Sequence, residues 1–212
     1  MTKLAASAWP KADLAAVGMP SSSVSLAELS TGDLAEAVHA IKNGHCYLDW
    51  RLFQFALSMF DHVQAVSKNV AVTQRSILDL EAQTALELQM SLDSTDHFAH
   101  ALLDDAVCAR DRLPAMFSTM RLGLIDRARF HRIVNETQLV RDDETMALID
   151  QTLALQIMGL RGGVSSMSIT KTGAMARRLV AEYDPDAEKL DRDRAKAARR
   201  GDRRPLPGRS TD

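Results

Sequence analysis

Apolar side chains recur at intervals of three and four residues from Ser25 onward, as they do in amphipathic helices that share a core. The turn residues at 31–32 and the glycine at Gly44 predict a first helix over residues 33–43, because glycine commonly follows the last helical residue. The next segment is the most apolar of the chain, and we expect it to form the central core element. Its broad apolar face comprises Leu52, Phe53, Ala56, Met59, Phe60 and Val63.

Turn-forming residues divide the middle of the chain into further helices. A third helix is predicted over residues 73–91. Either Asp93 or Ser94 is a suitable N-terminal cap for a fourth. The fourth helix should end near Leu113, because Pro114 disfavours the helical conformation in the residue before it.

Three shorter segments continue the helical pattern. Pro114 can open a short helix at its first position, and Gly123 then closes it. Asp126 is a cap for the helix that follows. After one more helix, Gly162-Gly163 breaks the helical pattern. The helix after Asp126 has Phe130, Ile133 and Val134 on its inner face, and the next carries Met146, Ile149, Leu153 and Ile157.

The C-terminal part holds one more apolar stripe and then becomes polar. The stripe comprises Met175, Leu179, Val180 and Tyr183. Asp184-Pro185 is a cap followed by a proline at the first helical position, and it opens a very polar helix that frays at Gly201. Neither strand alternation nor an internal repeat is found. We therefore predict an all-α globular bundle of about seven or eight helices with a polar, basic C-terminal helix and tail.

This pattern divides the chain into three parts. Residues 1–24 should be a flexible N-terminal segment, residues 25–184 the helical domain, and residues 185–212 a basic helix and tail. The predicted core residues are Phe53, Phe60, Phe117, Phe130, Ile149, Leu153 and Leu179.

Composition narrows the class of protein. The apolar fraction of 46% argues against global disorder, and the formal charge of -2 gives the whole molecule no strong attraction to nucleic acid or anionic membranes. Cys46 and Cys108 form no CxxC pair, which suits thiols in a reducing compartment. No apolar stretch approaches the roughly 20 residues of a spanning helix. We therefore expect a cytoplasmic protein without a membrane partner.

Charge is unevenly distributed along the sequence. Between Arg75 and Arg110 there are seven acidic residues and no lysine or arginine, whereas eight basic residues lie between Arg192 and Arg209. A basic tail can neutralise phosphates and bind DNA weakly, with steep salt dependence and no sequence preference; a solvated charged helix is the alternative interpretation. The residues predicted for a nucleic-acid contact are Arg192, Arg194, Lys196, Arg199, Arg200, Arg203 and Arg204.

Four short motifs together resemble a known family. They are Ala109-Arg110-Asp111-Arg112-Leu113-Pro114, Leu122-Gly123-Leu124-Ile125-Asp126, Asn135-Glu136-Thr137-Gln138-Leu139-Val140-Arg141-Asp142 and Leu179-Val180-Ala181-Glu182-Tyr183-Asp184-Pro185-Asp186-Ala187. In this order and spacing they resemble the 13E12-repeat family, a helical domain of unknown function that is abundant in mycobacteria and other actinobacteria. The resemblance covers about residues 45–204 and is strongest over residues 110–200.

The motif residues suit structural roles better than chemistry. Arg110, Asp111 and Arg112 lie where a helix meets a proline, so they can pair with neighbours or cap carbonyls. Gly123 permits a left-handed residue between helices, and Asp126 caps the next helix. We therefore expect these residues to hold the fold.

The resemblance also implies a nuclease context of mobile-element origin. Members of the family often continue into a C-terminal HNH endonuclease, whose histidines bind a divalent metal. The last histidine of this chain is His131, so the nuclease motif is absent from it. The segment over residues 84–103 resembles a helix-turn-helix, but its second helix carries aspartates and no lysine or arginine, which opposes docking on phosphate.

Other candidate sites favour simpler interpretations. His97, His100 and Asp104 share a helical face, but a helical metal site needs ligands from other helices as well. His39, His45 and Cys46 would need a fourth ligand, so polar residues at a helix junction are the simpler interpretation. We therefore predict no catalytic residue, no cofactor and no metal.

Three functional hypotheses remain. The first is a non-catalytic helical accessory module that contacts DNA through the basic tail. The second is a protein-interaction or self-association module, in which the acidic face over residues 79–105 meets a basic partner. The third is an inactive, truncated fragment of an HNH endonuclease.

Overall fold

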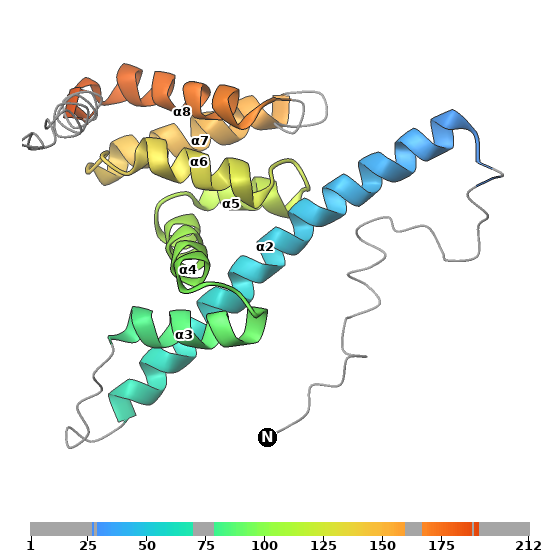
Figure 1. Cartoon of the computed structure of the whole chain (residues 1–212). Coiled ribbons are helices and arrows are strands. Elements are labelled where there is room, and N and C mark those ends of the chain that lie inside the picture. The colour runs from blue at the N-terminus through green and yellow to red at the C-terminus, as the bar shows by residue number, and fades with distance from the viewer. Residues whose placement is uncertain (1–26, 28, 70–78, 160–166, 188, 191–212) are drawn as a thin grey trace, which may run out of the picture.

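The computed structural model describes residues 27, 29–69, 79–159, 167–187 and 189–190, and within them regular structure is helical with no strand (Figure 1). This confirms the all-α prediction. The labelled helices are α2 (Thr31–Asn69), α3 (Leu80–Leu92), α4 (Asp96–Asp111), α5 (Pro114–Arg121), α6 (Arg127–Thr137), α7 (Asp143–Gly159) and α8 (Ile169–Tyr183). None of the helices in this described part is both long enough and apolar enough to cross a membrane.

The first two predicted helices are one. Helix α2 runs for 39 residues and passes through Gly44 without a break, so the predicted end at residue 43 is wrong. Glycine in a helix interior costs only about 1 kcal/mol relative to alanine, and a long helix that packs on a body offsets that cost. Gly44 is itself buried, at the point where α2 meets the body. The N-terminal half of α2 extends away from the other helices (Figure 1).

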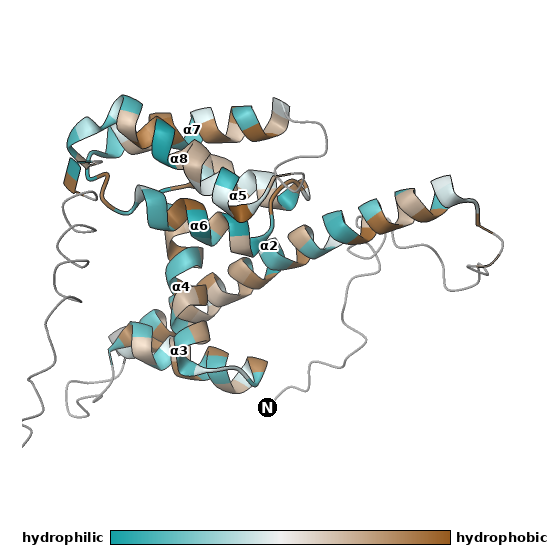
Figure 2. Cartoon of the chain, turned by 45° about the horizontal axis from the view of Figure 1, so that its top comes forward, coloured by the Kyte–Doolittle hydropathy of each residue, from teal (hydrophilic) through white to brown (hydrophobic). Residues whose placement is uncertain are grey.

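The remaining helices form a body along the C-terminal half of α2. Helices α3, α4 and α5 each pack against α2. Helix α7 packs on α5, and α8 packs on both α6 and α7. Helices α5 to α8 therefore lie together at one end of the body, and α3 lies at the other (Figure 1). Hydrophobic residues are not confined to this body, because they continue along the extended half of α2 (Figure 2).

Aromatic side chains mark the centre of the core. Phe53 of α2 and Phe130 of α6 are fully buried, with ring centroids 5.6 Å apart in an edge-to-face arrangement. The predicted core residues Ile149, Leu153 and Leu179 are buried as well. The predicted core residues Phe60 and Phe117 also pack against this core, but they are only partly buried and so lie at its edge.

Most helix ends follow the local signals. Pro114 opens α5, Gly123 adopts a left-handed φ of 75° after it, and Asp126 caps α6 with a bond of 2.9 Å to the amide of Arg129, all as predicted. The cap of α4 is Thr95 rather than Asp93 or Ser94. Asp93 instead ends α3 in the left-handed conformation, at φ 47°.

Other end predictions are confirmed or lie outside the structure. Helix α4 ends at Asp111 with Arg112 as its C-cap, near Leu113 as predicted, and Leu113 itself is not helical. Helix α3 begins at Leu80 after the cap residue Asp79, and the start predicted at residue 73 lies outside the described residues. The predicted flexible segment 1–24, the break at 162–163 and most of the polar C-terminal helix also lie outside them. The division into three parts therefore stays a prediction.

Candidate interaction surface and polar helix junctions

Arg112 joins three helices at the family-like motif. Its Nη2 donates to the carbonyl oxygens of Thr137, at 3.2 Å, and Val140, at 2.6 Å, and lies 3.6 Å from the Met146 sulfur. The guanidinium therefore extends from the end of α4 to satisfy carbonyl groups at the end of α6. Positive charge is favoured at this end of a helix. This contact confirms the prediction that the motif residues cap carbonyls.

Asp150 of α7 caps the start of α5. The N-cap residue of α5, Leu113, has no side-chain acceptor. The Asp150 carboxylate accepts from the amides of Ala115, at 2.7 Å, and Met116, at 2.9 Å. Asp150 is 2% exposed, and this desolvation raises its pKa although the two amide bonds lower it. Sequence reasoning missed this residue because its partners lie about 35 positions away.

Asp49 of α2 acts in the same way at the start of α6. Its carboxylate accepts from the backbone amide of Arg127 at 2.8 Å. Burial raises the pKa of Asp49, and the Arg127 amide bond opposes that effect. Helix α6 is therefore held at both ends by side chains from other helices, Asp49 and Arg112.

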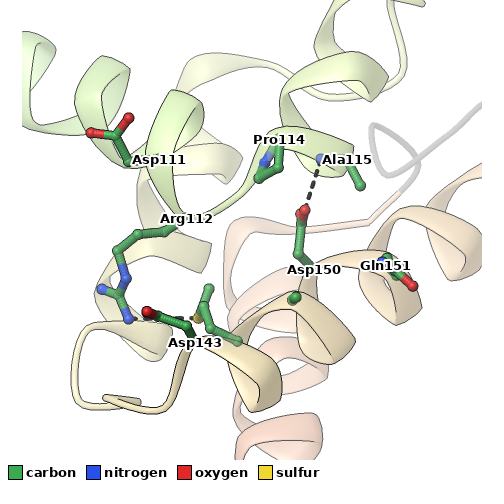
Figure 3. Close-up of a pocket in the computed structure, with 9 residues that line it drawn as sticks. Asp111, Arg112, Pro114, Ala115, Asp143, Asp150 and Gln151 are labelled. Carbon is green, nitrogen blue, oxygen red and sulfur yellow. Dashed lines mark hydrogen bonds between the residues drawn. The ribbon is translucent and has the colours of Figure 1, made fainter.

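A hollow of about 390 Å³ lies between the Arg112 and Asp150 junctions. Figure 3 shows Arg112, Asp143 and Asp150 around it, with Asp150 pointing to the amide of Ala115. The charged groups of Arg112 and Asp150 in this hollow already bond to backbone groups. Arg112 and Asp150 therefore act in this hollow as helix-capping residues.

Asp105 forms a second buried polar cluster, between α4 and α6. It is 1% exposed, and its Oδ1 lies 2.8 Å from His131 Nδ1. Arg127 Nε lies 3.6 Å from Oδ2, and the Arg127 guanidinium stacks 4.2 Å from the Phe98 ring centroid. Desolvation raises the pKa of Asp105, and the His131 hydrogen bond opposes the rise.

An Asp–His pair is also part of many catalytic triads. When His131 Nδ1 donates to Asp105, the other ring nitrogen, Nε2, accepts from the Asn135 side-chain amide, 3.0 Å away. A triad needs a hydroxyl or thiol nucleophile at that nitrogen, and here an amide donor occupies it. The cluster therefore links α4 to α6 and does not form a triad.

The histidine groups considered as metal sites are not assembled into one. His100 pairs with Asp96 at 3.5 Å, within one helix. Cys46 is buried, which raises the pKa of its thiol to about 11. Among the described residues, no three His, Cys, Asp or Glu side chains come together as a metal would require.

The helix that resembles a DNA-reading helix turns its apolar face inward. Helix α4 follows α3 after a short turn, as in a helix-turn-helix, and Ala99, Leu102 and Leu103 bury one face of it in the core. The outer face presents acids such as Asp96 and Asp104. This charge does not suit a phosphate backbone.

Helix α2 carries a long row of mostly exposed side chains that is apolar except for two histidines. We call it the α2 stripe, defined as Leu34, Val38, Ile41, His45, Leu48, Leu52, Phe55, Met59, His62 and Val66. Val38 is 67% exposed and Phe55 61% exposed, while Leu52 and Met59 are partly buried against the core. The row continues beyond the body onto the extended half of α2 (Figure 2).

The α2 stripe follows a seven-residue repeat, with successive members three or four residues apart. Sequence reasoning missed it, because an end at Gly44 splits the repeat into two short pieces. The detectable signal was the spacing of Leu34, Ile41, Leu48 and Phe55, which lie seven residues apart.

The residues predicted to contact nucleic acid, from Arg192 to Arg204, lie outside the described residues. The structure therefore does not place them relative to the junctions or to the α2 stripe. Their role stays a prediction.

Comparison with known families decides the relationship of the chain. Residues 62–206 match the family described as a domain of unknown function, DUF222. The chain belongs to this family. No curated protein and no solved structure matches it. The DUF222 match begins at His62, so it includes α3 to α8 and most of the α2 stripe precedes it.

Proposed function

We propose that this DUF222 protein is a helical protein-interaction module, in which the body supports α2 and the α2 stripe is the docking surface. The observation that carries the proposal is the exposure of the stripe over the length of a 39-residue helix. At the polar junctions, Asp49, Arg112 and Asp150 each bond to backbone groups of neighbouring helices, which supports a structural role for them.

Exposed apolar rows of this length are unusual on a surface helix that has no binding partner. A surface helix normally turns its apolar face to the core and its polar face to water. In the extended half of α2, Leu34, Val38 and Ile41 instead face solvent. Burying such a side chain stabilises an assembly by about 1.5–3 kcal/mol, so a partner helix would bind here favourably.

A photo-crosslinking amino acid in place of Val38 tests the docking surface in cells. We expect protein adducts whose attachment site maps to a helical segment of the partner. A second change, Ile41→Glu, should abolish them, because it places a charge in the same apolar row. The matched control carries the crosslinker in place of Glu36, on the opposite face of the same turn.

Three results would contradict the proposal. The first is the absence of adducts from Val38. The second is the same adducts from the Glu36 position. The third is an adduct confined to the chain that carries the crosslinker, which would mean that the stripe is covered internally.

A second candidate function is weak binding of DNA by the basic C-terminal segment. It is supported by the concentration of eight basic residues between Arg192 and Arg209 in a chain of net charge -2. Such binding follows counterion release and falls steeply with salt. This activity would make the protein an accessory factor that brings a partner to DNA.

A salt titration of duplex DNA binding tests this candidate. The variant replaces Arg199, Arg200, Arg203 and Arg204 with Gln, and the control replaces Arg110, which pairs with Asp61 and Asp111. We expect the slope of log affinity against log salt to fall by roughly 0.9 for each phosphate that the variant no longer neutralises. Equal slopes for variant and control, or no binding by the unmodified chain, would exclude the tail as a DNA contact.

A further inference from the structure

We infer that the partner of the α2 stripe is a second copy of this chain, paired with it along α2 in the same direction as a two-stranded coiled coil. This inference rests on the proposed function, since it names the occupant of the same surface. The residues that carry it are the members of the α2 stripe and the small residues beside them.

The period of the stripe favours a supercoiled helix as its partner. Residues three and four apart repeat as d and a positions of a heptad, from Leu34 at d to Val66 at a. A straight helix has 3.6 residues per turn, so a strict seven-residue row drifts by about 20° per heptad. Two helices that wind around each other follow such a row along its length, which a flat protein surface does not.

The positions that flank the row allow two copies to approach. Over residues 33–43 of α2, which precede the point where the helix meets the body, Ala35, Ala37 and Lys42 occupy the e and g positions. The acids over residues 33–43, Asp33 and Glu36, fall at c and f, away from the row, and the next acid, Asp49 at e, is bonded to the Arg127 amide of the body. Two identical faces therefore meet without a row of opposed like charges, which would oppose pairing.

Two histidines interrupt the apolar row and select like-with-like pairing. His45 takes an a position and His62 a d position, and both are exposed. A polar side chain at such a position fixes the register, because it is matched best by a polar side chain of the facing helix. In a parallel pair of identical helices, a faces a and d faces d, so each histidine meets its own counterpart.

The shape of the chain favours the parallel direction. The N-terminal half of α2 extends free of the body, and the body lies along the C-terminal half (Figure 1). With both helices in the same direction, the two free halves face each other and the two bodies lie at one end. The reverse direction would bring each free half alongside the body of the other copy.

Sedimentation equilibrium of the full-length chain is the first test. We expect a dimer, and we expect Val38→Glu and Ile41→Ser each to raise its dissociation constant, the former by at least about a hundredfold because it buries an unpaired charge. The control, His39→Glu, places the same charge on an exposed residue beside the row and should leave the dimer intact. Because these residues are exposed, urea unfolding of each variant should show an unchanged body.

Oxidative crosslinking tests the direction. Val38→Cys should form a disulfide between copies, since a parallel pair brings this position opposite its counterpart, whereas Glu36→Cys on the outer face should not. The native thiols should interfere little, because Cys46 and Cys108 are buried, with each thiol pKa raised to about 11.

The outcomes separate this inference from the proposed function. A monomer at high micromolar concentration overturns the second copy as partner; if photo-crosslinking at Val38 still captures a different protein, the docking function stands. A dimer that survives both Val38→Glu and Ile41→Ser places the contact elsewhere and overturns the inference. A dimer without a disulfide in the Val38→Cys variant overturns the parallel pairing.

Discussion

Buried carboxylates of this protein accept hydrogen bonds from backbone amides at helix starts, where no residue nearby in the sequence supplies an acceptor. At the start of α5, Pro114 has no amide hydrogen and Leu113 has no side-chain acceptor. The amides of Ala115 and Met116, the first two N–H groups of α5, therefore need an acceptor from elsewhere, and Asp150 accepts from both. The fold thus relies on a carboxylate that arrives from α7.

Replacing Asp150 tests the strength of this cap. Asp150→Ala should lower the free energy of unfolding by about 1–3 kcal/mol, because two backbone amides near the core lose their acceptor. Urea unfolding measures the change. The exposed neighbour Gln151 supplies the control, since Gln151→Ala should stay within about 0.5 kcal/mol of the unmodified protein. Equal effects of the two substitutions would mean that the cap contributes nothing specific.

Gly123 gives a second test at the same scale. It has a φ of 75°, and an added Cβ would lie 2.9 Å from Asn43 Cβ and 3.0 Å from the Asn43 carbonyl oxygen. Gly123→Ala should therefore destabilise the protein by about 1–3 kcal/mol, through backbone strain and displacement of α2. Thermal unfolding should show a lower midpoint. Gly159→Ala is the matched control, because an added Cβ meets nothing within 4 Å, and it should be neutral or slightly stabilising.

The partners that the sequence identifies are the local ones. Asp126 and Gly123 act on neighbours within a few positions, so the identities and order of residues suffice to assign them. Asp150 and Asp49 act on amides 34 to 78 positions away. Their roles depend on helix packing, which a single sequence does not specify.

Between helices, Arg112 of the family-like motif links the end of α4 to backbone carbonyls beyond it. Its guanidinium bonds to the carbonyls of Thr137 and Val140, which belong to the end of α6 and the turn after it. Arg112→Met keeps much of the aliphatic volume and removes the donors. We expect a loss of about 1–3 kcal/mol in the free energy of unfolding.

The control for Arg112 is the neighbouring exposed cation. Arg110→Met removes an ion pair with Asp61 and Asp111 at the surface, and such pairs contribute at most about 1 kcal/mol. Hydrogen exchange should show earlier opening at the end of α6 in Arg112→Met only. If Arg110→Met costs as much as Arg112→Met, the interhelical cap is not what stabilises this junction.

Helix α2 shows where local rules fail for whole elements. Glycine ends many helices, and the rule predicts an end at Gly44 that does not occur. The helix continues because Cys46, Phe53 and Ala56 on its C-terminal side are buried in the body, and this packing outweighs a cost of about 1 kcal/mol. Reading through Gly44 recovers the seven-residue repeat, so the same error hid the candidate docking surface.

For the whole molecule, three desolvated carboxyls should make stability depend on pH. Desolvation raises the pKa of Asp49, Asp105 and Asp150 above the ordinary 3.8. Each carboxyl then holds its proton more tightly in the folded protein than in the unfolded chain. Below pH 3.8 both states are protonated and no penalty exists. As pH rises above that value, the unfolded chain loses the proton first, and the folded state becomes relatively less stable until pH passes the raised pKa.

The contribution of these three carboxyls to the free energy of unfolding should therefore fall as pH rises from about 4 toward neutral. Asp111 and Asp142 have lowered pKa values, so their stabilising contributions are complete above 3.8 and do not reverse this trend. Urea unfolding at a series of pH values from about 4.5 to 7 measures the slope, and Asp150→Asn should reduce it by removing one of the three groups. Because the asparagine side chain does not ionise, the gap in stability between this variant and the unmodified protein should change with pH across the same window. A slope of opposite sign, or one unchanged by Asp150→Asn, would show that the desolvated carboxyls are not the source of the pH dependence.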